Sequence, residues 1–384
     1  MRFEKAADLH ILAIVQHYGT DNPVLGFVVP WLDALASRTR KLTVLSLGVV
    51  DPPTRPNMTL LSLGKERGLR FARVGYLWRW HKTMRNLLQV DPPQLVLTHM
   101  TPLYSVMTAP YVWRHEIPIV TWFSYPSMKP TLWIRLAECV SQVIASITHN
   151  TYPMASEKIV GLGHAIDTNL FSPTVGSENT EDSQHPVLLN VGRLASSKDH
   201  RTLIDALRNL RSHGINPRLN ILGGSTKQDL EYVSWIKEYV AANGLNHAVE
   251  FKGGVRNKDL PEWFRAATLH VDCCHPLDKT HLEALATGCI SLAPRNDTFS
   301  RIFGDTAEQI SFSQGNSLEL TQKILNILSM PREQKDILRK KIRDAVILKF
   351  GMDAFHDRMT QLFVRILQQK QNFSASQFNA LCDL

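Results

Sequence analysis

Two short stretches in the C-terminal half of the chain combine residue types that are complementary to phosphates and hydroxyls. Arg193 and Lys198 follow an apolar segment, in the sequence Val-Gly-Arg-Leu (191–194) that runs on to Lys198-Asp199. Further along, Glu283 lies in the sequence Leu-Glu-Ala-Leu-Ala-Thr-Gly (282–288). Two cations suit a diphosphate, and a carboxylate can accept hydrogen bonds from a pair of sugar hydroxyls. The two stretches therefore predict a site for a ligand that carries both groups.

Each stretch follows a predicted strand and leads into a predicted helix. Arg193 and Lys198 come after the apolar segment 187–191, just ahead of a helix that we expect to start near Asp199. Glu283 is expected in the first turn of a helix that begins near Leu282, after strand 269–272. Because a helix N-terminus favours anions, the two cations there would form a diphosphate clamp. The alternatives are a solvated loop with two surface cations and an acid that merely complements the helix dipole.

Short apolar segments alternate with helical periodicity along the whole chain, a pattern typical of parallel sheets with crossover helices. In the first half, we predict helical segments at 31–40 and 132–141 and strands at 11–15, 42–47, 94–98, 117–121 and 143–148. In the second half, helices are predicted to begin near residues 199, 228, 260, 282 and 317, and strands to lie at 187–191, 218–222, 249–252, 269–272 and 290–293.

The length of the chain and one polar stretch predict two domains. A chain of 384 residues is too long for one ordinary core, and residues 172–183 are polar, acidic and without periodicity. We expect an α/β protein with two doubly wound, Rossmann-like domains that face a cleft. The predicted limits are 1–172 for the N-terminal domain, 173–186 for the linker, 187–350 for the C-terminal domain, and 351–384 for a last helix (352–369) and tail.

Composition and cysteine usage point to a globular protein of a reducing compartment. Apolar residues make up 44% and charged residues 20% of the chain, and no stretch approaches the roughly 20 apolar residues of a membrane span. The apolar run 11–15 is too short for the core of a signal peptide. Five cysteines, none with Cys-x-x-Cys spacing, argue against disulfides and against a zinc site. We therefore expect a cytoplasmic protein.

Positive charge is concentrated in the first half, which suggests an anionic partner. Residues 1–171 contain 17 Lys and Arg against 11 Asp and Glu, whereas the rest contains 26 against 24. No signature of a nucleic-acid-binding module accompanies this charge, so nucleic acid is not expected. Segment 73–85 mixes cations with Trp and Leu, as a helix at a membrane interface does, so we expect peripheral contact with an anionic membrane. The alternative is an amphipathic helix that packs Leu77, Trp80 and Met84 on its own domain.

Taken together, these stretches resemble the nucleotide-sugar site of glycosyltransferase family 4. In the first half, the segments 62–66, 99–104 and 163–171 are similar to a bacterial branch of the same family. The resemblance implies a two-domain GT-B fold whose last helix crosses back to the N-terminal, acceptor-side domain. It further implies transfer of a sugar from a nucleoside diphosphate donor with retention of configuration, and no need for a metal ion or other cofactor, because Arg193 and Lys198 would stabilise the leaving diphosphate.

The chain departs from the family pattern at two positions. The family usually carries a second Glu eight residues before the one that matches Glu283, and His275 occupies that position here. Backbone amides near Thr280 could still hold phosphate. Many members carry a His near the reacting sugar, where this chain has Tyr125, which donates hydrogen bonds but lacks the ionisation range of His.

Further candidate site residues come from other strand ends. His99 and His164 are candidate cleft histidines, although a lone His is more often a structural hydrogen-bonding group. Gly224 follows strand 218–222 and permits a close approach of the backbone to a ligand. The resemblance would place the nucleotide base against the loop that contains Val255 and Arg256.

The resemblance and these residues together imply a retaining hexosyltransferase, with catalytic residues Arg193, Lys198, Glu283 and His164. Its acceptor would be a cell-envelope glycan or a lipid-linked intermediate, and it would be cytoplasmic or peripheral at the inner face of the membrane. One alternative is a non-catalytic nucleotide-sugar-binding protein on the same fold, which the departures at His275 and Tyr125 keep open. A nucleotide-sugar epimerase ranks last, because the two C-terminal stretches match the transferases better.

Overall fold

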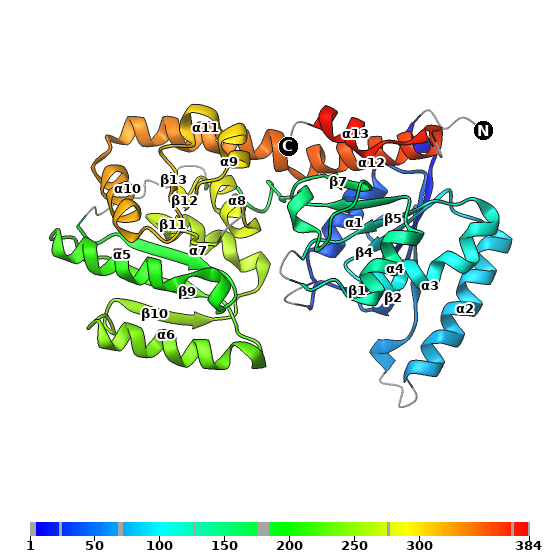
Figure 1. Cartoon of the computed structure of the whole chain (residues 1–384), viewed down its shortest axis with the longest axis horizontal. Helices are drawn as coiled ribbons and strands as arrows, with labels where there is room; N and C mark the ends of the chain where they lie inside the picture. The colour runs from blue at the N-terminus through cyan, green and yellow to red at the C-terminus, as the bar shows by residue number, and fades with distance from the viewer. Residues whose placement is uncertain are drawn as a thin grey trace. The chain divides into compact units, whose positions relative to one another are not determined.

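The protein divides into two compact units, each built around its own parallel sheet. A computed structural model describes residues 5–22, 25–67, 72–125, 128–174, 184–274, 277–369 and 372–382. The first unit comprises Met1–Ala165 together with Met352–Leu384, and the second comprises Ile166–Gly351 (Figure 1). The predicted linker lies largely outside the described residues, and the predicted domain limits stay a prediction.

The first unit contains a seven-stranded sheet in the order β3-β2-β1-β4-β5-β6-β7, with every described pairing parallel. Its strands are β1 (His10–Tyr18), β2 (Lys41–Val49), β3 (Met58–Ser62), β4 (Leu95–His99), β5 (Ile119–Trp122), β6 (Val143–Ser146) and β7 (Ile159–Gly161). The central strands β1 and β4 are almost fully buried because helices cover both faces. The strand order reverses between β1 and β4, which is the switch point of a doubly wound sheet.

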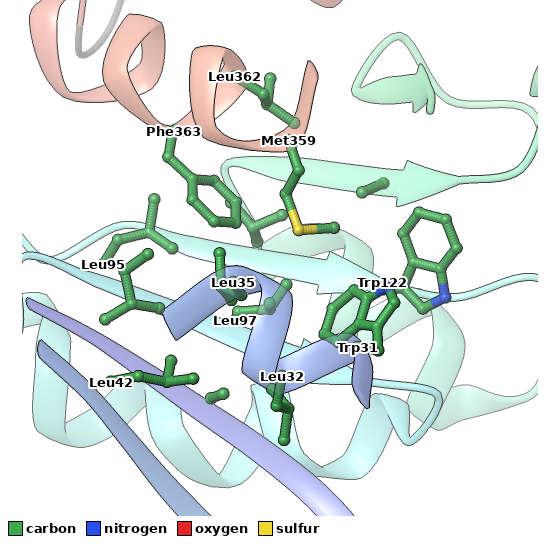
Figure 2. Close-up of a cluster of buried hydrophobic side chains, with 14 of the residues drawn as sticks. Trp31, Leu32, Leu35, Leu42, Leu95, Leu97, Trp122, Met359, Leu362 and Phe363 are labelled. Carbon is green, nitrogen blue, oxygen red and sulfur yellow. The ribbon is translucent and has the colours of Figure 1, made fainter. Parts of the chain in front are cut away.

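The helices of the first unit are α1 (Val28–Ala36), α2 (Ala72–Val90), α3 (Pro102–Val112), α4 (Leu132–Val140), α12 (Met352–Gln369) and α13 (Ala375–Cys382). Figure 2 shows how α12, from the far end of the sequence, completes the core over the sheet. Met359, Leu362 and Phe363 of this helix lie in one cluster of buried side chains with Trp31 and Leu35 of α1. The expected return of the last helix to the N-terminal unit is confirmed by this packing.

The second unit repeats the architecture with a six-stranded parallel sheet in the order β10-β9-β8-β11-β12-β13. Its strands are β8 (Val187–Val191), β9 (Arg218–Leu222), β10 (Val249–Gly253), β11 (Leu269–Val271), β12 (Ser291–Pro294) and β13 (Ser311–Phe312). Its helices are α5 (His200–Ser212), α6 (Leu230–Ala242), α7 (Leu260–Ala266), α8 (Lys279–Ala286), α9 (Asp297–Phe303), α10 (Ser317–Ser329) and α11 (Arg332–Phe350). The expected fold class, two doubly wound α/β sheets, is confirmed.

One predicted helix boundary that matters for the site is wrong. Helix α8 begins at Lys279 and not near Leu282, because the Asp278 side chain caps it and accepts a hydrogen bond from the Lys279 amide at 2.6 Å. Glu283 therefore lies in the second turn of this helix, not in the first.

Candidate functional site

The strand order of the second unit brings the two chemically informative stretches to one edge of the sheet. Strand β8 pairs with both β9 and β11, so the strand order reverses between β8 and β11. Arg193 and Lys198 follow the carboxyl end of β8, and the segment that leads into α8 follows the carboxyl end of β11. Ligands of doubly wound sheets bind at such a switch point, outside the carboxyl ends of the strands.

Lys198 is held in place by the loop that follows β11. It ends a short 3-10 helix, Ser196–Lys198, and its ammonium group forms an ion pair with the Asp278 carboxylate. Its aliphatic stem passes over Gly192, where an added Cβ would lie 3.2 Å from the Lys198 Cε. Because Asp278 also caps α8, one carboxylate fixes both the start of the helix and the position of the cation.

Arg193 is more exposed and has a looser partner. Its Nε lies 3.7 Å from the carboxylate of Asp229, which also accepts hydrogen bonds from the backbone and hydroxyl of Thr226. These hydrogen bonds from Thr226, together with the Arg193 charge, lower the pKa of Asp229. The guanidinium therefore remains accessible at the edge of the sheet, where a diphosphate could contact it.

Glu283 is buried, with 1% of its surface exposed, and its carboxylate is already engaged on one side. The Asn257 amide donates to Oε1 at 3.3 Å, and the Lys279 ammonium lies 3.2 Å from the same oxygen. Both contacts use Oε1. Oε2 takes part in neither of these two contacts, and a carboxylate oxygen can accept one or two hydrogen bonds.

Backbone contacts between glycines join the loops after β8 and β9. Gly223 has φ of +150°, and a Cβ there would overlap the carbonyl oxygen of Gly192. The Leu194 amide donates to the Gly224 carbonyl at 2.9 Å, and the Gly223 amide donates to the Gly253 carbonyl at 2.8 Å. Gly224 itself is exposed at the end of this row of backbone hydrogen bonds. This exposure is compatible with a close approach of a ligand to its backbone.

The loop after β10 places the predicted base-binding residues at the same edge. Val255 is partly exposed, and Arg256 is exposed and paired with Asp259 at 2.7 Å. Asn257, the next residue, is the one that contacts Glu283. Thr280 lies in the first turn of α8 with its hydroxyl buried and without a hydrogen-bond partner among the described residues. His275 lies outside the described residues.

Two acidic residues near Lys198 were not predicted as site residues. Asp272 follows β11, is 2% exposed, and accepts a hydrogen bond from the Cys274 amide at 2.8 Å. Burial raises its pKa, although the nearby Lys198 charge opposes this shift. Ligating atoms of Asp272, Cys274 and Asp278 lie within 4.8 Å of one another, and the paired Lys198 supplies the positive charge there. An Asp directly before a helix is a capping signal that could have drawn attention to Asp278.

Three predicted site residues belong to the first unit. His99, at the end of β4, is 4% exposed and packs against Phe27 and Trp31 at ring-centroid distances of 6.0 and 5.5 Å. Burial lowers its pKa to about 4, so the ring is neutral near pH 7. Its surroundings favour a packing role, and its role towards substrate stays a prediction.

The other two are more accessible. Tyr125 follows β5, is exposed, and its amide donates to the Thr151 carbonyl at 2.9 Å. His164 is partly exposed and follows Gly163, whose φ is +76°. Neither residue is buried in the core, so both keep the accessibility that their predicted roles require.

Comparison with known proteins relates the second unit to a known family. Residues 174–345 match the family described as glycosyl transferases group 1. Mannosylfructose-phosphate synthase of Agrobacterium fabrum is 36% identical over 107 residues, which is 27% of this chain and 24% of that protein. The chain thus matches about a quarter of the length of this relative.

Solved structures agree in fold across both units. HepE of Anabaena, in complex with UDP and glucose, gives a TM-score of 0.69 at 15% identity and covers 92% of this chain and 99% of its own. A glycosyltransferase from Rickettsia africae gives a TM-score of 0.70 at 14% identity, with coverage of 94% and 99%. Residues 174–345 thus match the glycosyl transferases group 1, and the two parallel sheets and these structures show that the chain has the GT-B fold.

Proposed function

We propose that this chain transfers a hexose from a nucleoside diphosphate sugar, with retention of configuration, to a cell-envelope glycan or lipid-linked acceptor. The observation that supports binding of the sugar donor is the position of Lys198. Its ammonium group is held by Asp278 at the switch point of the second sheet. Arg193 lies on the same loop. The buried Glu283 carboxylate belongs to α8, which follows the neighbouring strand β11. In a relative of the same fold, HepE, the bound donor is UDP-glucose.

In this proposal, electrostatic stabilisation of the leaving group supplies most of the rate enhancement. When the bond between the anomeric carbon and the diphosphate oxygen breaks, negative charge develops on the diphosphate. Arg193 and Lys198 would stabilise that charge from positions set before the reaction. Glu283 would accept hydrogen bonds from donor hydroxyls through Oε2, and the 255–256 loop would contact the base. His164 and Tyr125 would act on the acceptor side.

A thermal-shift screen against UDP-, GDP-, ADP- and dTDP-sugars tests the donor half. A donor at 100 times its dissociation constant should stabilise the protein by about 2.7 kcal/mol, which raises the melting temperature visibly. The double variant Arg193→Ala/Lys198→Ala should lose this shift, whereas Lys237→Ala, which removes an exposed cation of α6, should keep it.

The outcomes separate the proposed enzyme from its alternative. A shift together with slow hydrolysis of the same donor supports the transferase. A shift without hydrolysis or transfer to any tested acceptor would support a non-catalytic binding protein, and no shift with any of the four donors would contradict donor binding altogether.

Helix α2 supports a lipid-linked acceptor and a position at the membrane surface. The helix buries Trp80 and Met84, at 2% and 0% exposure, yet leaves Val74, Leu77 and Trp78 exposed. The Lys82 ammonium lies 5.3 Å from the centre of the Trp78 ring. An exposed apolar stripe bordered by cations is typical of a membrane-binding helix.

A cavity of about 800 Å³ adjoins this stripe. It is lined by Trp78, Lys82 and Arg85 of α2 and by residues of β2 and β3 such as Thr43 and Leu61. A search of the described residues finds no helix with the length and apolar character that crossing a bilayer requires. Contact through α2 would therefore be peripheral, at the cytoplasmic face in this proposal.

Lys82→Gln/Arg85→Gln should weaken binding to vesicles of phosphatidylglycerol and phosphatidylcholine by about 30-fold. Each cation near such a surface contributes about 1 kcal/mol, and the loss should shrink as salt rises. Arg79 is left in place because it donates a hydrogen bond to the Leu63 carbonyl within the unit. Co-sedimentation measures the binding.

The matched control is Lys237→Gln/Lys341→Gln, which removes two exposed cations of the second unit. It should sediment like the wild type, and hydrolysis of a soluble donor should be normal in both variants. If the wild-type protein does not bind anionic vesicles at low salt, the proposed membrane contact is refuted. The acceptor would then be sought among soluble glycans.

A further inference from the structure

Three side chains with metal-binding groups come together beside Lys198, between the end of β11 and the start of α8. Asp272, Cys274 and Asp278 are close in sequence, and their ligating atoms all lie within 4.8 Å of one another. The expectation of no zinc site rested on the missing Cys-x-x-Cys spacing. That spacing does not detect a set of two carboxylates and one thiol, which has to be recognised from its geometry.

The carboxylate of Asp272 has one oxygen that the protein leaves unsatisfied. The residue is 2% exposed, and its Oδ1 accepts a hydrogen bond from the Cys274 amide at 2.8 Å. The other oxygen, Oδ2, is buried and has no hydrogen-bond partner among the described residues. Burial of a carboxylate oxygen is costly unless a donor or a cation satisfies it. Oδ2 therefore points to a cationic ligand that the protein itself does not supply.

The Lys198 ammonium serves only part of this cluster. It pairs with the Asp278 carboxylate and hydrogen-bonds to the Cys274 sulfur, whereas Asp272 Oδ2 is left over. An ammonium is a single charge on a flexible four-carbon stem, and 16% of the Lys198 side chain is exposed. The ammonium can therefore withdraw when a cation that bonds to all three groups competes for them.

We infer that Asp272, Cys274 and Asp278 form an inhibitory site for Zn²⁺, which binds in competition with the Lys198 ammonium. Zn²⁺ binds thiolate sulfur at about 2.3 Å and carboxylate oxygen at about 2.0–2.2 Å, with tetrahedral geometry. These bonds place neighbouring ligands about 3.5 Å apart, so the three side chains need to close in only slightly from their present separation. The thiol selects Zn²⁺ over Mg²⁺ and Ca²⁺, which prefer oxygen ligands, and it releases its proton to water on binding.

A metal at this site would act on the proposed reaction through Lys198, and this part of the inference rests on the proposed function. Asp278 is the carboxylate that holds the Lys198 ammonium in place. When Asp278 bonds to Zn²⁺ instead, the ammonium loses its fixed position beside the leaving diphosphate. Bound Zn²⁺ therefore lowers donor turnover, and a chelator restores it.

Titration of the metal-free protein with Co²⁺ tests the site without any sugar donor. Co²⁺ accepts the same kinds of ligand as Zn²⁺, and a bond between thiolate and Co²⁺ gives a charge-transfer band in the near ultraviolet. The wild type should show this band at equimolar Co²⁺ and lose it when Zn²⁺ is added. Cys274→Ser should show no band, and Asp272→Asn should bind Co²⁺ at least about 10-fold more weakly. The control Cys139→Ser removes an exposed thiol of α4 and should match the wild type.

Lys198→Ala distinguishes competition with the ammonium from simple metal binding. Without the ammonium, Asp278 and Cys274 have no resident cation to displace, so Co²⁺ should bind at least about 10-fold more tightly than to the wild type. Arg193→Ala removes a cation of the same loop that pairs with Asp229 and not with the cluster, so its Co²⁺ affinity should equal that of the wild type. Circular dichroism establishes that every variant is folded.

The remaining results would overturn the inference in distinguishable ways. A folded wild type without the thiolate band contradicts the site, and a band that disappears in Cys139→Ser but not in Cys274→Ser indicates an adventitious thiol. Equal affinity in Lys198→Ala and the wild type refutes the competition. Donor hydrolysis that Zn²⁺ leaves unchanged or raises, in a protein that shows the band, refutes the inhibition. If no donor is hydrolysed at all, the proposed function fails while the cobalt result stands.

Discussion

Replacing Lys198 or Arg193 with Ala should lower donor turnover by about 10²-fold or more, the scale that one lost transition-state donor produces. Lys198 should give the larger loss, because its pairing with Asp278 and its passage over Gly192 hold the ammonium in one place. A positioned charge needs no reorganisation when the leaving diphosphate forms. Steady-state hydrolysis of the donor identified in the thermal-shift screen measures the effect.

Two further variants test whether the fixed position of the Lys198 ammonium, and not its charge alone, is responsible for donor turnover. Asp278→Asn keeps a capping side chain for α8 but removes the carboxylate that holds Lys198, so it should lose less activity than Lys198→Ala. Lys237→Ala, which removes an exposed cation on α6, should have normal turnover. Near-normal turnover in both folded Arg193 and Lys198 variants would refute the diphosphate role of these residues.

The free energy of unfolding should fall steeply as the pH drops from 6.5 towards 4. Burial lowers the pKa of His99, His200 and His356 to about 4 and that of His281 to about 3, and it lowers the pKa of His270 well below 6.5. Above pH 6.5 these rings are neutral in both states, so they cause no pH dependence. Below it, the unfolded chain binds protons that the native state does not, and stability is lost by up to about 1.4 kcal/mol per pH unit for each ring.

One pair of these histidines shows why the native state resists protonation. His270 and His281 each place Nδ1 within hydrogen-bond distance of the Ser291 hydroxyl, at 2.7 and 2.6 Å. One hydroxyl can donate to one ring and accept from the other, which suits two neutral rings. Among the described residues no acidic group pairs with either ring, so an added proton would place an uncompensated charge in the interior. Asp272 acts in the opposite direction, because burial raises its pKa, but it is one group against several.

Urea denaturation at pH 7, 6 and 5 measures the slope. His99→Phe keeps an aromatic ring against Phe27 and Trp31 and should reduce the slope by up to about 1.4 kcal/mol per pH unit. His115→Gln, at an exposed position, should leave it unchanged. A free energy of unfolding that stays constant from pH 6.5 to 5 would contradict the assignment of neutral buried histidines.

The fold could be predicted from the sequence wherever an apolar run was long enough to define a buried strand. The predicted segments 187–191 and 218–222 coincide with β8 and β9. Strands β7 and β13 were missed because they contain three and two residues, too few for a pattern. The edge strand β3 was missed because Thr59 and Ser62 are exposed and Leu60 and Leu61 are only partly buried.

The site was predictable in its residue types but not in its internal contacts. Arg193, Lys198 and Glu283 come from two short motifs, each of which spans only a few residues. The pairing of Lys198 with Asp278 spans 80 residues and depends on the order of the strands, which a single sequence does not state. The burial of His99 could not be predicted for the same reason, because Phe27 and Trp31, which cover its ring, come from the start of α1, far away in the sequence.

The contact between Gly192 and Gly223 has a consequence for anyone who wishes to change the donor preference by exchanging loops. No side chain fits at Gly223 while the carbonyl of Gly192 stays where it is, and the Leu194 amide depends on the carbonyl of Gly224. The segments after β8 and β9 therefore have to be exchanged together, although Leu194 and Gly224 are 30 residues apart in the sequence. A graft that replaces both from the same parent preserves their fit, whereas a chimera that mixes parents must first repair it.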